Sequence, residues 1–221
     1  MTAPQLARLY ERRFAGREAY RQAVWCVLCQ EFFSRWISPD ATVLDLGAGN
    51  CEFINAVTAR RRLALDLNPQ TALKAATGIE VWLRNCAEPW LVEAGSVDVI
   101  FTSNFFEHLP AKPDLSATLA QAHRALRAGG TLLAIGPNVR YTGGAYWDFW
   151  DHHIPLTDRS LSEALEQAGF RVTKSVPRFL PYTMSGGATY PFLFLKAYLR
   201  LPLLWRLFGQ QFFIVAVKPA Q

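Results

Sequence analysis

The sequence predicts one α/β domain over residues 1–221, with helices on both sides of a mostly parallel sheet. Short apolar runs alternate with helical patterns from residue 42 to residue 138, which indicates repeated β-α units. A helical insertion at 183–210 then precedes a last apolar run at 212–217. Together these observations predict a mostly parallel sheet of seven strands.

The first 38 residues form the predicted N-terminal helical region. Residues 3–37 carry apolar side chains at helical spacing, so one side should face a core. Pro39 ends the region, because proline disfavours helix at the residue before it. The apolar positions are Trp25, Leu28, Phe32 and Trp36. The opposite side is basic, with Arg8, Arg12, Arg13, Arg17 and Arg21.

The predicted β-α core spans residues 42–138. Its expected strands are 42–46, 62–66, 78–82, 97–101 and 131–135, and 170–179 and 212–217 follow after the core. Its expected helices are 52–61, one starting near Pro69, and one from about Asp114 to a stop at Gly129-Gly130. A further helix should begin with a capping box at Ser160-x-x-Glu163 and end before Gly169.

The turn after the first strand has the pattern Asp45-x-Gly47-x-Gly49. Glycine lets the backbone turn sharply and lets a ligand approach closely. A dinucleotide site would want a third glycine where Glu52 stands, and a carboxylate there would face a pyrophosphate. The alternatives are therefore another nucleotide-like ligand or a tight turn without a ligand.

This pattern resembles motif I of the class I S-adenosylmethionine-dependent methyltransferases. That family usually has a further glycine where this chain has Cys51. The segment Ser103–Leu109 is similar to the family's S-N-x-x-E-H-L sequence after strand four. The resemblance covers residues 42–138. It implies a three-layer Rossmann-like methyltransferase fold, an antiparallel last strand in the seven-stranded sheet, and S-adenosylmethionine as the cofactor.

The resemblance also implies where the cofactor binds. Asp66, at the tip of the second strand, suits the ribose hydroxyls, and it could also cap the next helix. Cys86 stands where many relatives have an acid beside the adenine. His108 is expected on the cofactor side, or in a structural role, rather than as a base. The predicted cofactor-binding residues are Asp45, Gly47, Ala48, Gly49, Asp66, Leu67, Cys86, Ala87, Ser103, Asn104 and His108.

Residues 139–221 form the predicted acceptor side, and the aromatic stretch 139–156 could wall an acceptor pocket. His152 or His153 suits removal of a proton from a hydroxyl, with Asp151 to orient it. A packed loop with capping polar groups is the alternative, and no metal site is expected. The sequence of this region resembles uncharacterised bacterial methyltransferases associated with surface glycans, which implies a saccharide or lipid-linked acceptor.

The segment 190–208 is rich in Leu, Phe and Trp, and its only charges are Lys196, Arg200 and Arg206. Such a segment predicts contact with a membrane surface, with Pro202 dividing it into two pieces. A helical insertion packed on the sheet is the alternative. Neither a signal peptide nor a membrane-spanning run is expected, so the chain is placed in the cytoplasm, or peripherally at the inner membrane surface.

The predicted function is methylation of an oxygen on a small-molecule or glycan acceptor. The alternatives are an adenosyl-ligand-binding protein without transfer activity and an RNA methyltransferase. The net charge of +5 favours anionic partners, but no RNA-binding module is recognisable and no nucleic acid is expected. The pair Cys26 and Cys29 has no second Cys/His pair to complete a zinc site, and buried thiols are the simpler interpretation.

Overall fold

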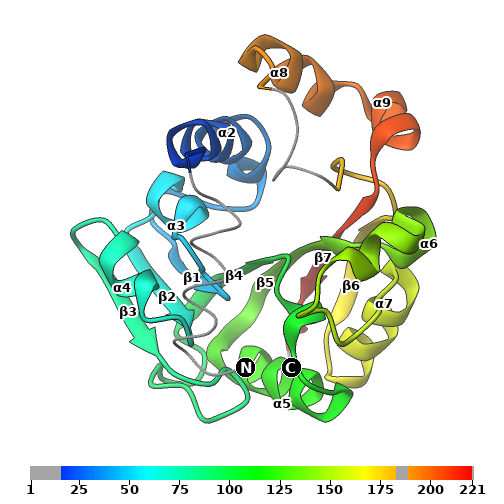
Figure 1. Cartoon of the computed structure of the whole chain (residues 1–221). Helices are drawn as coiled ribbons and strands as arrows, with labels where there is room; N and C mark the ends of the chain where they lie inside the picture. The colour runs from blue at the N-terminus through cyan, green and yellow to red at the C-terminus, as the bar shows by residue number, and fades with distance from the viewer. Residues whose placement is uncertain (1–15, 183–188, 221) are drawn as a thin grey trace.

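The computed structural model describes residues 16–182 and 189–220. Seven strands form one sheet in the order β3-β2-β1-β4-β5-β7-β6, with helices on both sides (Figure 1). The strands are β1 (Thr42–Leu46), β2 (Arg61–Asp66), β3 (Ile79–Leu83), β4 (Val97–Ser103), β5 (Leu126–Pro137), β6 (Arg171–Val176) and β7 (Gln211–Val217). This architecture confirms the predicted fold class.

The sheet is parallel except at β7, which runs antiparallel to both β5 and β6. Strand β1 is buried along its whole length because it lies between β2 and β4 and has helices over both faces. A strand in this position needs apolar residues on both sides, which explains its continuous apolar sequence. The carboxyl ends of β1, β2 and β4 therefore lie at one edge, where parallel sheets bind ligands.

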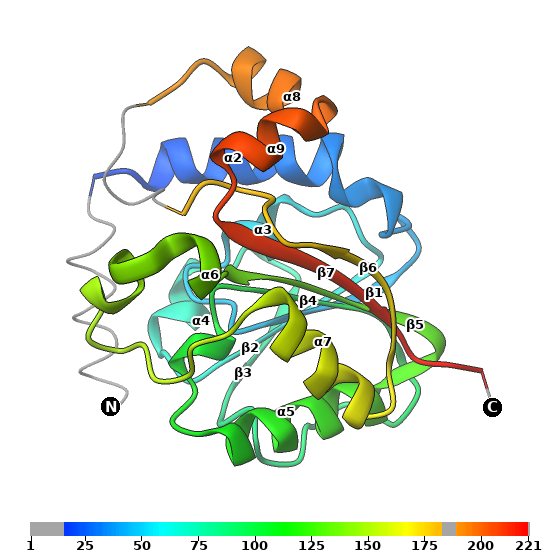
Figure 2. The ribbon, with the colours of Figure 1, turned by 90° about the vertical axis from the view of Figure 1, so that its right-hand side faces the viewer.

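Two helical layers cover the sheet. Figure 2 shows α2, α8 and α9 on one side and α5 and α7 on the other. Each layer has its own buried apolar cluster, so the core is split by the sheet into two halves. The helices are α2 (Glu18–Glu31), α3 (Glu52–Ala56), α4 (Gln70–Lys74), α5 (Lys112–Ala125), α6 (Val139–Thr142), α7 (Asp158–Gln167), α8 (Phe192–Arg200) and α9 (Pro202–Phe208). Short 3-10 helices lie at Phe33–Arg35, Phe106–His108 and Gly143–Asp148.

Two helices end earlier than the sequence predicts. Helix α3 stops at Ala56 rather than near residue 61, because Val57 is extended and Arg61 already pairs with Thr42 in the sheet. Helix α5 stops at Ala125, and Leu126 pairs with Val97. The expected stop at Gly129-Gly130 is therefore wrong, since both glycines lie within β5, between Leu126 and Thr131, where the register against β4 shifts.

The N-cap of helix α7 lies three residues before the expected one. The Thr157 hydroxyl accepts the backbone N–H of Ser160, and the Ser160 hydroxyl accepts the N–H of Thr157. Serine thus replaces the usual Glu or Gln of a capping box, and the prediction of Ser160 and Glu163 as the pair is wrong. Gly169 has a φ of +91°, which confirms the predicted glycine after this helix.

Where it is described, the insertion before β7 contains α8 and α9, and Pro202 begins the second helix, as predicted. Residues 183–188 of the predicted insertion lie outside the described part of the chain. Helix α2 begins at Glu18, so the expected helix over 3–37 is seen only in part. Arg8, Arg12 and Arg13 lie outside the described residues. Among the helices that are described, none has the length and apolar character needed to cross a membrane.

Candidate active site

The glycine turn after β1 closes against the segment after β4. Gly47 has a φ of +74° and Gly49 a φ of +50°, a region that L-residues with a Cβ rarely adopt. A Cβ on Gly47 would lie 2.3 Å from Cγ of Phe105. Position 47 therefore requires glycine for two reasons, the backbone conformation and the ring that lies against it.

Cys51 also adopts the left-handed conformation, with a φ of 61°. The resemblance places a glycine here in other family members, and the backbone explains that preference. The Cys51 side chain is fully buried, and its thiol lies 3.4 Å from the carbonyl oxygen of Thr71. Burial raises the pKa of this thiol to about 12, so the cysteine serves as a small packing residue.

Asp66 fastens the tip of β2 to the glycine turn. One carboxylate oxygen accepts the N–H of Gly49 at 2.7 Å, and the other accepts the N–H of Asn68 at 2.7 Å. Burial raises the pKa of Asp66, and these hydrogen bonds oppose the shift. Its expected role toward the ribose stays a prediction, because in this structure both oxygens brace the turn.

Asp45 is the buried acid at the end of β1. Burial raises its pKa well above the usual value, and the nearby charges of Asp66 and Glu52 add to the shift. The ionised side chain is thus destabilised at this position, as is common at functional sites.

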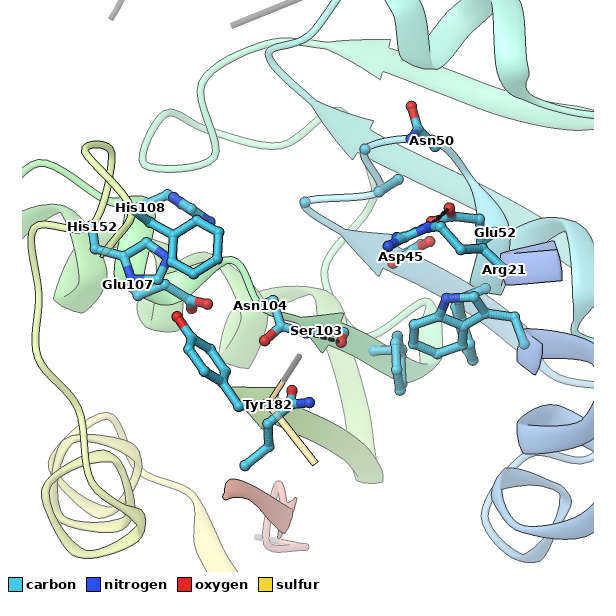
Figure 3. A pocket seen from close by; sticks show the side chains of 18 residues that line it. Arg21, Asp45, Asn50, Glu52, Ser103, Asn104, Glu107, His108, His152 and Tyr182 are labelled. Carbon is cyan, nitrogen blue, oxygen red and sulfur yellow. Dashed lines mark hydrogen bonds and ion pairs between the residues drawn. The ribbon is translucent and has the colours of Figure 1, made fainter. Parts of the chain in front are cut away.

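A pocket extends from this turn toward the segment after β4 (Figure 3). It contains about 970 Å³ of space that no protein atom fills, open solvent at its mouth included. The predicted site residues that line it are Asp45, Gly47, Ala48, Gly49, Ser103, Asn104, His108 and His152. The predicted residues outside its lining are Asp66, Leu67, Cys86, Ala87, Asp151 and His153.

Helix α2 supplies one wall that sequence reasoning did not identify. The Arg21 guanidinium makes two hydrogen bonds to the Glu52 carboxylate, at 2.6 and 3.1 Å. Trp25 lines the pocket, and its indole N–H has no hydrogen-bond partner among the described residues. Gln211 also lines the pocket, and its side-chain oxygen likewise has no hydrogen-bond partner among the described residues, while its amide nitrogen donates to the carbonyl oxygen of Pro181. Buried polar atoms of this kind are suited to a bound ligand.

The other end of the pocket holds His108. Its Nδ1 lies 3.1 Å from a carboxylate oxygen of Asp151 and 3.0 Å from that residue's carbonyl oxygen. Burial alone would lower the pKa of His108, but the Asp151 hydrogen bond and the charges of Glu107 and Asp151 raise it. Asp151 therefore orients the distant His108, whereas the sequence suggested that it would orient a neighbouring histidine.

His152 and His153 have different surroundings. His152 is buried, lines the pocket, and places Nδ1 2.9 Å from the carbonyl oxygen of Tyr146. The Tyr146 hydroxyl in turn donates to the carbonyl of Ile154, which fixes the loop around it. The His153 side chain is exposed, and the backbone N–H of His153 donates to the carbonyl oxygen of Glu107.

Glu107 is a pocket residue that the sequence analysis did not select. Its side chain is 2% exposed, and burial raises its pKa to about 7. The signal was present, because Glu107 is the acid of the S-N-x-x-E-H-L pattern. Figure 3 shows Glu107, His108 and His152 gathered at one end of the pocket, with Asp45 at the other.

The predicted adenine contacts are engaged within the protein. The Cys86 thiol accepts from the Thr118 hydroxyl at 3.3 Å, and its carbonyl accepts the indole N–H of Trp90. The N–H of Ala87 donates to the Asn85 side chain. Contacts from Cys86 and Ala87 to an adenine ring therefore stay a prediction.

The model of the methyltransferase-domain family matches residues 17–175. A search of curated proteins found no match. A solved S-adenosylmethionine-dependent methyltransferase from Archaeoglobus fulgidus is 22% identical, with 95% of this chain and 98% of that chain covered and a TM-score of 0.67.

Two further solved structures share the fold. One belongs to the complex of the Haloferax volcanii Trm112 methyltransferase activator with a methyltransferase, at 18% identity, 100% and 99% coverage and a TM-score of 0.71. The other is the [4+2]-cyclase SpnF, at 14% identity, 90% and 81% coverage and a TM-score of 0.62. S-adenosylmethionine is the cofactor that this family and fold imply, and the glycine turn and the unpartnered polar atoms of the pocket fit such a ligand. The chain therefore belongs to the methyltransferase-domain family and has the fold of the class I, S-adenosylmethionine-dependent members.

Proposed function

We propose that the chain transfers a methyl group from S-adenosylmethionine to a hydroxyl oxygen of a saccharide, lipid-linked glycan or small-molecule acceptor. The observation that carries the proposal is that the glycine turn and a group of acid and imidazole side chains line one pocket. When bound, the cofactor supplies a methyl group on a sulfonium sulfur. Asp45, Gly47 and Gly49 would hold it, while the opposite end is left for the acceptor.

His152 is the proposed proton acceptor. Its Nδ1 faces a carbonyl oxygen, so Nδ1 carries the hydrogen and Nε2 carries the lone pair. The ring lies in the pocket wall, where it can reach a hydroxyl placed between it and the glycine turn. A positioned base of this kind contributes about 10² to 10⁴ in rate.

The acceptor class is supported by the loop around His152. Trp147 is 61% exposed and Trp150 91% exposed, and both lie on the loop that leaves the carboxyl end of β5. Large aromatic faces with a polar edge suit an amphipathic sugar ring. The resemblance of this loop to glycan-associated methyltransferases points the same way.

Isothermal titration with S-adenosylmethionine and its demethylated product tests the cofactor site. We expect heat with both ligands in the wild-type protein and none with Gly49→Val, because a β-branched residue resists a φ of +50° and fills the turn. Folded wild-type protein that gives no heat with either ligand would refute the proposal. Tight binding without product in any acceptor screen would instead indicate a binding protein.

His152→Gln and His153→Gln form a matched pair for the base. A labelled donor with bacterial glycan and lipid extracts identifies an acceptor, and the two variants are then compared at equal cofactor occupancy. We expect a loss of about 10²-fold or more for His152→Gln and near wild-type activity for His153→Gln, since only the first ring lines the pocket. Equal activities of the two variants would show that His152 is not the proton acceptor.

A second proposed property is peripheral contact with a membrane surface through α8 and α9. Leu193, Leu203 and Leu207 are 75%, 72% and 66% exposed, a grouping that a protein surface seldom presents without a partner. Lys196 and Arg200, however, pair with Glu31 at 3.0 and 2.9 Å, so part of the expected basic charge is already neutralised within the protein. The exposed leucines therefore support the membrane contact more strongly than the basic side chains do.

Vesicle flotation tests the surface. We expect wild type to float with anionic vesicles, and Leu193→Ser with Leu203→Ser to abolish flotation while cofactor binding is kept. Leu73→Ser is the control, because Leu73 is 77% exposed on α4 rather than on α8 or α9. Wild-type protein that stays unbound at low salt would contradict the membrane contact.

A further inference from the structure

The acid and imidazole groups at the far end of the pocket have the composition of a metal site. One oxygen of Glu107 and one ring nitrogen each of His108 and His152 lie within 4.8 Å of one another. Glu107 and His152 are buried, and the His108 side chain is 18% exposed. Two imidazoles and one carboxylate are a donor set that first-row divalent metal ions use, with positions left open for a substrate.

The groups behind the two rings support this assignment. Nδ1 of His108 is held by Asp151, and Nδ1 of His152 faces the carbonyl oxygen of Tyr146. Histidines that bind metals usually donate their other ring N–H to a carboxylate or a backbone carbonyl. When each ring is neutral, this arrangement leaves the lone pair on Nε2, the atom that would bind a metal ion.

Charge and distance are also compatible with a divalent ion. Glu107 and Asp151 bring two carboxylates to the cluster, which would offset a double positive charge. Ligands at about 2.1 Å from a tetrahedral ion lie roughly 3.4 Å apart. From separations of up to 4.8 Å, closure needs inward side-chain movement of about 1.5 Å at most.

We propose that Glu107, His108 and His152 bind a divalent first-row metal ion of the zinc or cobalt type. The ion would hold the acceptor hydroxyl and make it more acidic, so that the O–H bond breaks, its proton passes to water, and the electron pair stays on the oxygen. The use of the ion rests on the proposed methyl transfer, whereas its binding does not. With the ion present, His152 is a ligand, and without it His152 takes the proton directly.

Metal binding is measured first, on the full chain after removal of metals with a chelator and dialysis. We expect Zn²⁺ to bind with a one-to-one stoichiometry by titration calorimetry, and Co²⁺ to give a visible absorption band from nitrogen and oxygen ligands. Glu107→Gln and His152→Gln should each weaken binding at least tenfold, and Asp151→Asn should weaken it about 10- to 100-fold through His108. His153→Gln and His123→Gln are controls that should bind like wild type.

Thermal unfolding and S-adenosylmethionine binding are recorded for every variant, so that a folding defect or a failed cofactor site is recognised separately. Absence of stoichiometric Zn²⁺ and Co²⁺ binding in wild type overturns the inference, and so does binding that survives both Glu107→Gln and His152→Gln. Loss of methyl transfer on chelation, restored by Zn²⁺ or Co²⁺, supports it. Full activity in chelator overturns the role of the ion and leaves the methyltransferase proposal intact.

Discussion

Replacing Gly47 by alanine isolates the contact between the glycine turn and Phe105. A Cβ there meets three atoms of the Phe105 side chain at 2.3 to 2.7 Å, in a backbone conformation with a φ of +74°. The left-handed conformation costs an L-residue about 1–2 kcal/mol. Overpacking against the ring adds about 1–3 kcal/mol, so Gly47→Ala should destabilise the protein by about 2–5 kcal/mol.

Gly78→Ala is the matched control. Gly78 has a φ of +85°, and nothing lies within 4 Å of its added Cβ, so only the conformational cost of about 1–2 kcal/mol applies. Thermal and denaturant unfolding of both variants give the difference, at about 2–4 °C per kcal/mol for a chain of this size. Combining Gly47→Ala with Phe105→Ala should recover about 1–3 kcal/mol of coupling. Equal effects of Gly47→Ala and Gly78→Ala, with no coupling to Phe105, would refute the reasoning.

Two further predictions concern the same turn. Cys51→Gly removes a left-handed strain of about 1–2 kcal/mol but also a buried side chain, so the free energy of unfolding should stay within about 1 kcal/mol of wild type, whereas Cys51→Val should lower it clearly. Asp45 has a raised pKa in the folded state, so its contribution to stability is present at low pH and is lost as the pH rises through that pKa. Asp45→Asn should therefore melt higher than wild type at pH 7, with the gain shrinking toward pH 4, while its affinity for S-adenosylmethionine falls. A gain that grows toward low pH would contradict this sign.

The parts of the fold that were predictable are those set by neighbouring residues. The apolar run of β1 and the glycines after it mark a buried strand and its turn within a few positions of sequence. The predicted ends of helices α3 and α5 were wrong where pairing within the sheet overrides the local helix preference. Leu126 belongs to a strand because Val97 pairs with it, and nothing near Leu126 in the sequence shows this.

The candidate site divides in the same way. Gly47 and Gly49 follow from a local motif, and the structure places both at the pocket. The pairing of Asp151 with His108 joins residues 43 positions apart, and the wall formed by Trp25 joins α2 to the turn after β1. Contacts of this range depend on how the layers pack, so spacing alone did not show the pairing of Asp151 with His108.

Helix α2 takes part in two surfaces at once. Near the start of α2, the Arg21 guanidinium donates hydrogen bonds to the Glu52 carboxylate beside the pocket. Tyr20, also near the start of α2, stacks on Phe192 of α8 with ring centroids 5.7 Å apart. At its other end Glu31 pairs with Lys196 and Arg200 of α8. Only a ligand with different affinities for two positions of α2 would change affinity at the other surface, and that change would then be reciprocal. Helix α2 is thus a structural element that the pocket wall and the outer helices share, so a displacement of α2 at one surface is also a displacement at the other.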